Sequence, residues 1–166
     1  MPDDRHRDPI AEAARLWEEH GWGQAAPGMA AVTSLMRAQQ LVLSRVEAVL
    51  RPLGITFARY EVLMLLYLSR RGTLPMRLIS TRLQVHQTSV TNAVDRLQAA
   101  DLVRRRPHPS DRRTTLVEIT PAGRDLAVDA TAVLNREVFA QPGLNARDTT
   151  GLVEILGRLR RNAGDF

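Results

Sequence analysis

The twelve residues 104–115, RRRPHPSDRRTT, concentrate positive charge and turn-forming residues in one short stretch. They contain five arginines, two prolines and one aspartate. Like charges repel within a folded chain, so such a cluster favours a partner that supplies negative charge. Arginine binds phosphate and guanine through a planar, bidentate guanidinium. The stretch therefore predicts contact with phosphate groups; the alternative is a solvated basic loop in which Asp111 is a turn residue.

The composition restricts the kind of partner. The net charge is +5 and all 23 basic residues are arginine. A GC-rich genome would also enrich arginine, so the clustering carries more weight than the count. Aromatic residues make up only 4% of the chain, which disfavours single-stranded nucleic acid, because its bases stack on aromatic side chains. A chain of 166 residues favours a single domain.

The same composition bears on compartment and chemistry. The chain lacks cysteine, which excludes disulfides and fits a reducing cytoplasm. No apolar run approaches the ~18 residues that span a bilayer, so we expect a cytoplasmic protein without membrane contact. The four histidines, His6, His20, His86 and His108, lack metal-ligand spacing. No nucleophile elbow, phosphate loop or paired-carboxylate motif is present, so we expect no enzyme activity, cofactor or metal.

Helical periodicity and capping signals predict most of the elements. Apolar residues at helix spacing predict helices over 10–20, 29–50, 56–68, 75–83, 87–100, 121–138 and 145–161. QAAPG is expected to be a linker before the second of these. Two short helices joined by a tight turn at 84–86 indicate a helix-turn-helix. Asp101 is expected to end the second helix of the pair, because Asp tolerates left-handed backbone geometry.

Two β-prone stretches follow directly. LVRRR and TTLVEIT predict a hairpin with PHPSDR at its tip. A helix-turn-helix followed by a hairpin is a winged helix. The predicted fold is therefore mainly α with a small β-hairpin wing. The apolar stripes of the first long helix and of the last helix would be exposed in a monomer unless they met a partner; the alternative is that they pack within one chain.

The helix at 87–100 has chemistry suited to the major groove. Val90, Ala93, Val94 and Leu97 share one face, which leaves short polar side chains on the other. Hydroxyl and amide groups near a helix N-terminus reach base edges and phosphates. On the hairpin, an arginine at a narrow tip can enter the minor groove, and Asp111 is expected to hold one guanidinium there. The candidate DNA-binding residues are Gln87, Thr88, Ser89, Thr91, Asn92, Arg96, Arg106, Asp111, Arg112 and Arg113.

Two stretches carry a resemblance to a known family. VHQTSVTNAVDRLQAADLV and DRRTTLVEITPAG resemble the recognition helix and the D-x-R…L-T-x-x-G pattern of the multiple antibiotic resistance regulator (MarR) family of winged-helix repressors. The resemblance implies a homodimer that binds an inverted repeat in double-stranded DNA and is released by a small, often aromatic and anionic effector. The alternative function is an architectural or partner-binding winged helix that binds DNA without sequence choice.

The sequence identifies the effector less clearly than it identifies the DNA-binding residues. IAEAARLWEEHGW resembles the Trp-bearing helix of the urate-responsive branch of the family, but Arg59-Tyr60-Glu61 and Thr91-Asn92-Ala93 depart from the patterns of that branch. Candidate effector contacts are Trp17, Trp22, Arg37 and Tyr60; alternatively the tryptophans are hydrophobic anchors and Arg37 forms a surface salt bridge. The expected organisation is an N-terminal extension (1–28), dimerisation helices (29–55 and 120–166) and a DNA-binding winged helix (56–119).

Overall fold

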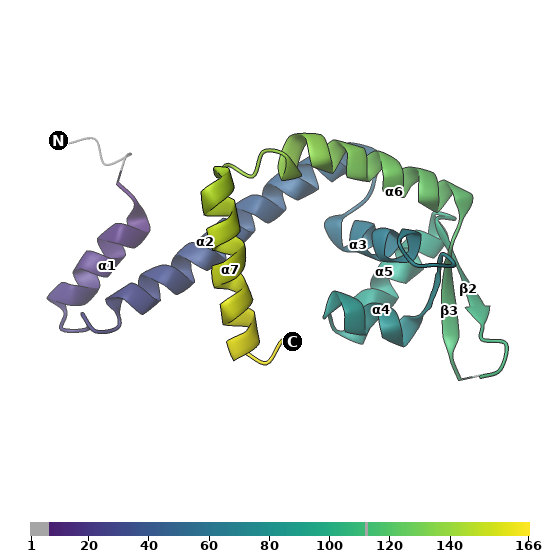
Figure 1. Ribbon diagram of the computed structural model, residues 1–166, viewed down its shortest axis with the longest axis horizontal. Helices are drawn as coiled ribbons and strands as arrows, with labels where there is room; N and C mark the ends of the chain where they lie inside the picture. Colours follow the sequence, from purple (N-terminus) through teal and green to yellow (C-terminus); the bar gives the residue numbers. More distant parts are fainter. Residues whose placement is uncertain (1–6, 112) are drawn as a thin grey trace. The chain divides into compact units, whose positions relative to one another are not determined.

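The computed structural model describes residues 7–111 and 113–166. Contacts within the chain divide it into two compact units, Met1–Arg45 and Val46–Phe166. The first unit holds helix α1 (Pro9–Glu19) and most of helix α2 (Ala26–Leu50), and the second holds the end of α2 and all later elements (Figure 1). No helix in the described ranges is both long and apolar enough to cross a membrane.

The first unit begins with a capped helix. The Asp8 side chain accepts a hydrogen bond of 3.0 Å from the Ile10 backbone N–H, and Pro9 occupies the first helical position, where its missing N–H costs nothing. Helix α2 starts at Ala26, so only Gln24 and Ala25 of the predicted QAAPG linker lie between the helices, and the other three residues begin α2. Pro27 lies in the first turn, where a proline is tolerated for the same reason.

The second unit is a winged helix with flanking helices. Its elements in chain order are η2 (Arg51–Leu53), α3 (Phe57–Tyr67), β1 (Thr73–Pro75), α4 (Met76–Leu83), α5 (Gln87–Ala99), β2 (Val103–Pro107), β3 (Thr115–Ile119), α6 (Pro121–Leu134), the π-helical η3 (Asn135–Phe139) and α7 (Ala146–Asn162). The predicted fold, mainly helical with a β-hairpin wing, is confirmed.

The sheet has one strand more than the sequence predicted. Strands β2 and β3 form the expected antiparallel hairpin, and β1 pairs with the other edge of β3, giving the order β1-β3-β2. We predicted that Pro75 begins a helix, but it ends β1 and precedes α4 in extended conformation. A strand of three residues has no alternation long enough to identify, so only its pairing with β3 defines it.

Two left-handed residues set the turns on either side of α5. Gln84 has φ 54° and Asp101 has φ 56°, and Asp101 ends the turn after α5 as predicted. The Gln84 side chain is held from both sides: its Nε2 donates to the Asp165 carbonyl at 2.8 Å, and its Oε1 accepts from Arg160 at 3.1 Å. The segment after α7 therefore contacts the turn of the helix-turn-helix.

The junction between wing and α6 is tightly packed. Thr120 caps α6 by accepting from the Gly123 N–H at 3.0 Å, and its hydroxyl donates to the Asp101 carbonyl at 2.7 Å. A Cβ at Gly123 would lie 2.1 Å from the Leu102 carbonyl oxygen, so no larger residue fits there without backbone movement. This contact fixes the end of the wing and explains the T-x-x-G part of the motif.

One apolar core joins these elements. The inner faces of α3, α5 and α6 and the inner side of the sheet supply most of the fully buried side chains, and α2 and α4 add Leu50 and Ile79. Val90, Ala93, Val94 and Leu97 are all buried, which confirms the predicted inner face of α5. The polar side chains of α5 therefore point away from the core of the winged helix.

Candidate nucleic-acid interface

Helix α5 begins with an N-cap that sequence analysis did not identify. The His86 ring Nδ1 accepts from the Thr88 backbone N–H at 3.3 Å and lies 3.1 Å from the Thr88 hydroxyl. Capping leaves the first turn ordered while its other N–H groups remain directed along the helix axis, where they favour a negatively charged group. The predicted candidates Gln87, Thr88 and Ser89 lie in this turn, all exposed.

The exposed surface of α5 consists of two stripes at helix spacing. The wing-facing stripe contains Gln87, Thr91, Asp95 and Gln98, and the outer stripe contains Thr88, Ser89, Asn92 and Arg96. Seven of these residues are exposed and Thr91 is half-buried. The outer stripe carries short hydrogen-bonding side chains followed by Arg96, which is a surface that a major groove accommodates.

A groove separates α5 from the wing. It has a volume of about 500 Å³ and is lined by Met76, Arg77, Gln87, Thr91, Arg105, Arg113, Thr114 and Thr115. We call it the basic groove, since it has three arginines and no acidic residue in its lining. In the described chain, Arg77 and Arg113 have no acidic partner within salt-bridge distance. Their guanidinium groups are therefore available to an anion.

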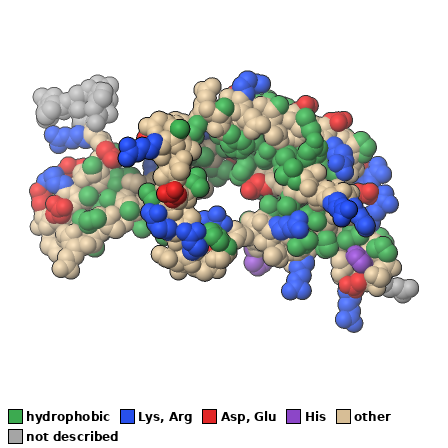
Figure 2. Space-filling view, in the orientation of Figure 1, with side chains coloured by type: hydrophobic (Ala, Val, Ile, Leu, Met, Phe, Trp, Pro, Cys, Tyr) green, Lys and Arg blue, Asp and Glu red, His purple; other side chains and the backbone are tan. Residues whose placement is uncertain are grey.

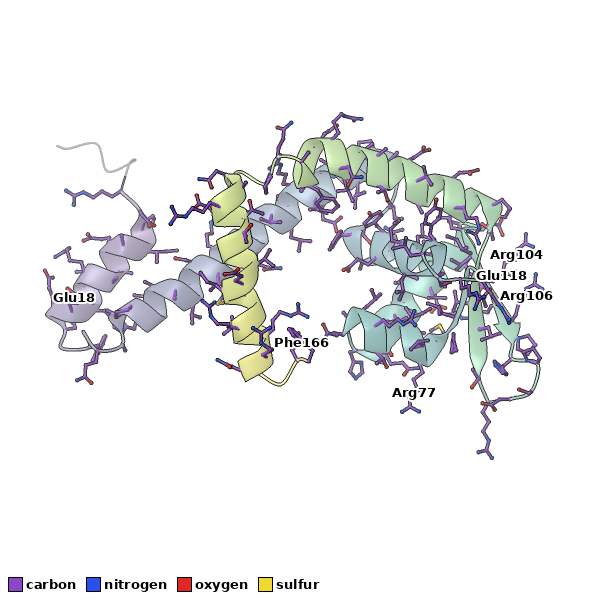
Figure 3. The ribbon with its side chains drawn as sticks, viewed as in Figure 1. Glu18, Arg77, Arg104, Arg106, Glu118 and Phe166 are labelled. Carbon is purple, nitrogen blue, oxygen red and sulfur yellow. The ribbon has the colours of Figure 1, made fainter. Side chains whose placement is uncertain are left out.

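Arg77 was not among the predicted residues. It lies in the first turn of α4, and Figure 3 shows its side chain extending away from the lobe on the side where the wing hairpin ends. Arginine side chains project from this edge of the molecule in the space-filling view (Figure 2). A single arginine in a short helix has no distinguishing signal in the sequence; only the position of α4 beside the wing brings Arg77 to the groove.

The three arginines of β2 divide between the two faces of the wing. Strand residues alternate in direction, and Arg105 faces α5, where it pairs with Asp95 at 2.6 Å and donates to Gln98 at 3.0 Å. Arg104 and Arg106 extend from the opposite face (Figure 3), where Arg106 pairs with Glu118. The structure therefore does not bring the predicted Arg106 to the basic groove; Arg105 is there instead.

At the wing tip, Asp111 organises the backbone. Its carboxylate accepts from the Arg113 backbone N–H at 2.9 Å and from the Thr114 hydroxyl at 2.6 Å. We expected Asp111 to hold a guanidinium; in the described residues it forms a turn that positions Arg113 through the main chain, which is the alternative stated above. Arg112, also predicted to bind DNA, lies outside the described residues.

These hydrogen bonds lower the pKa of the Asp111 carboxyl, chiefly through the Thr114 hydroxyl and then the Arg113 N–H. Because the folded-state pKa is depressed, the stabilisation is fully present above the ordinary Asp range and is lost as the pH falls through the lowered value. Replacing Thr114 by Val is expected to return the Asp111 pKa toward its ordinary value. Carboxyl ¹³C chemical shifts followed through an acid titration measure this, and equal midpoints in both proteins would contradict it.

The predicted effector residues are distributed over both units. Trp17 and Trp22 pack edge to face with ring centroids 5.2 Å apart, and Arg37 lies exposed on α2 with its guanidinium 3.4 Å from Gln40. These three belong to the first unit, whereas Tyr60 is a core residue of the second, with its hydroxyl 3.0 Å from that of Thr131. Their contact with an effector stays a prediction. Over residues 7–111 and 113–166, no acidic or histidine cluster could hold a metal.

The comparisons with known proteins agree with this geometry. A model of the MarR family matches residues 53–114. The MarR family transcriptional regulator Sco5413 from Streptomyces coelicolor has a solved structure that is 48% identical, with a TM-score of 0.77 over 84% of this chain and 97% of that one. The chain belongs to the MarR family.

Two further comparisons cover most of the chain. BpsR from Bordetella bronchiseptica has a solved structure with a TM-score of 0.69 at 25% identity, over 76% of this chain and 90% of that one. The transcriptional regulator MhqR from Bacillus subtilis is 27% identical over 136 residues, or 80% of this chain and 90% of its own. Sco5413 and MhqR are transcriptional regulators and BpsR binds DNA. This member of the MarR family is a DNA-binding regulator.

Proposed function

We propose that this protein is a homodimeric repressor that binds an inverted repeat in double-stranded DNA and is released by a small effector. The basic groove carries the proposal, because it places three arginines beside the polar stripes of α5. Helix α5 would enter the major groove with the outer stripe toward the base edges. The wing would place Arg113 in the adjacent minor groove, where negative potential is concentrated. Arg77 would bind phosphate and fix the register.

The exposed apolar side chains support a homodimer. On α7, Leu152, Val153, Ile155 and Leu159 are each exposed by 43% or more, and on α2 Val32, Met36, Leu41 and Val42 are exposed by 54% or more. On α7, Leu152, Ile155 and Leu159 recur at helix spacing, and an exposed apolar stripe of this kind indicates an interface. A dimer with two-fold symmetry presents two copies of α5, and half-sites of an inverted repeat would then lie about 10 bp apart, one helical turn. The domain organisation given above, with dimerisation helices flanking the winged helix, is part of this proposal.

Asn92 is an outer-stripe residue that can distinguish bases, because an amide binds adenine bidentately. Replacing Asn92 by Ala is expected to blunt discrimination among operator variants by about 1–3 kcal/mol and to change the affinity for random DNA much less. Competition binding with single-base operator variants and random duplex measures the two separately. Equal losses on operator and random DNA would reassign Asn92 to phosphate contact.

An effector is proposed from the relatives. The DNA binding of BpsR is regulated by 6-hydroxynicotinic acid, an aromatic acid. For this chain we propose a small aromatic or anionic effector, with Trp17, Trp22, Arg37 and Tyr60 each as a candidate contact. Such a molecule releases DNA only if it binds more tightly to an arrangement of the dimer in which the two winged helices do not fit successive major grooves.

The decisive experiment is a titration of purified protein against its own upstream intergenic DNA and against length-matched scrambled DNA at two salt concentrations, with footprinting. A protected inverted repeat and a specific-to-random affinity ratio of about 10³ or more would support the proposal. Equal, steeply salt-dependent binding to both DNAs would favour the architectural alternative or an operator elsewhere.

A further inference from the structure

An acidic residue lies on the surface that faces DNA in the proposed complex. Asp95 belongs to the wing-facing stripe of α5, one turn beyond Thr91 of the basic groove, and its side chain is 54% exposed. A carboxylate there repels phosphate whatever the DNA sequence. A contribution to DNA affinity therefore does not explain why Asp95 lies on this surface.

The explanation lies in the partner of Asp95. The Asp95 Oδ1 pairs with one terminal nitrogen of Arg105 at 2.6 Å, and the other terminal nitrogen donates to the Gln98 Oε1 at 3.0 Å. The Arg105 side chain is only 27% exposed. Both ends of its guanidinium are therefore bound to α5, in contrast to Arg77 and Arg113, which have no acidic partner in the described chain.

We propose that Asp95 is a specificity-determining residue: it neutralises Arg105 and holds it against α5, so that this arginine does not bind phosphate in complexes with random DNA. The inference rests on the proposed DNA-binding function and deepens it. In a complex with random DNA, no base contact fixes the position of the winged helix. It can therefore shift along the DNA until each arginine that has no acidic partner contacts a phosphate. In the operator complex, base contacts fix the register, so an Arg105 without a neutralising carboxylate beside it gains less.

The substitution Asp95→Asn separates charge from shape. The Asn oxygen still accepts a hydrogen bond from Arg105 and Gln98 is unchanged, so the wing keeps its attachment to α5 while the net charge of the pair rises by one. We expect the affinity for scrambled DNA to rise roughly five- to ten-fold at about 0.1 M salt, the size of one added phosphate contact, with a salt slope steeper by about 1. Operator affinity rises less, so the ratio of operator to scrambled affinity falls.

Asp129→Asn is the matched control. It removes the same charge from an exposed position on α6, and α6 lies on the side of the lobe away from α4 and the wing tip (Figure 1). At a separation beyond the Debye length of about 10 Å it should leave both affinities nearly unchanged. A second variant, Asp95→Asn with Arg105→Gln, should return the scrambled-DNA affinity to within about two-fold of wild type, because the added charge is removed.

Binding is measured by fluorescence anisotropy on footprinted operator and scrambled duplex at several salt concentrations, and thermal unfolding shows that each variant is folded. The inference is overturned if Asp95→Asn raises both affinities equally, lowers both, or behaves like Asp129→Asn. A fall on both DNAs would make Asp95 a structural support of the wing. If wild-type protein itself gives no footprint and no affinity ratio, the proposed function fails and this inference fails with it, whereas a wild-type ratio that Asp95→Asn leaves unchanged overturns the inference alone.

Discussion

Replacing Ile155 by glutamate is expected to abolish operator binding at protein concentrations that saturate the wild type. Ile155 lies on the apolar stripe of α7 and is 56% exposed in the single chain, so the change does not touch the core. In the proposed dimer a glutamate there is buried against apolar surface at a cost of several kcal/mol. A monomer binds only one half-site. It therefore lacks the gain in operator affinity, roughly 100-fold or more, that comes from joining two winged helices in one dimer.

Thr150→Glu supplies the control. The substitution adds the same charge on the polar side of α7, where Thr150 lies near Arg147, Glu154 and Arg158 by helix spacing. Sedimentation equilibrium measures the association state, and operator titration measures binding. We expect Ile155→Glu to sediment as a folded monomer with weak binding, while Thr150→Glu remains dimeric. A dimeric Ile155→Glu protein with unchanged operator affinity would remove α7 from the interface.

Replacing Arg113 by Ala is expected to weaken operator binding by about 1–3 kcal/mol and to relax the preference for A·T pairs flanking the half-site. Arg113 lines the basic groove, and its backbone is held by Asp111 at 2.9 Å. The guanidinium therefore extends from an ordered turn, so binding need not order the backbone that carries it, and more of its interaction with the minor groove is retained as affinity.

Arg104→Ala tests whether the loss of operator affinity in Arg113→Ala comes from the position of Arg113 or only from its charge. It removes the same charge from the same hairpin, but Arg104 lies on the face of β2 opposite to α5 (Figure 3). Operator titration and footprinting of both variants are expected to show a large loss and a narrowed flanking footprint only for Arg113→Ala. Similar losses for the two variants would mean that the wing acts through overall charge, and an unchanged affinity in Arg113→Ala would exclude the wing from recognition.

Local patterns in the sequence determined much of this protein. The inner face of α5, the cap at Thr120, the left-handed Asp101 and the β2–β3 hairpin follow from helix spacing, capping chemistry and strand alternation, which depend on neighbouring residues. The resemblance of residues 85–123 to the MarR family followed from the same stretch. These features are local, so the sequence alone predicts them.

Contacts between distant residues were decided only by the tertiary structure. The direction of Arg105 and Arg106 depends on the pairing register of β2 with β3, because a shift of one residue exchanges the two faces of a strand. Strand β1 exists because β3 has a free edge, and Arg77 reaches the basic groove because α4 packs beside the wing. In each of these cases the determining partner is distant in the sequence and is brought into contact by folding, and no local spacing encodes it.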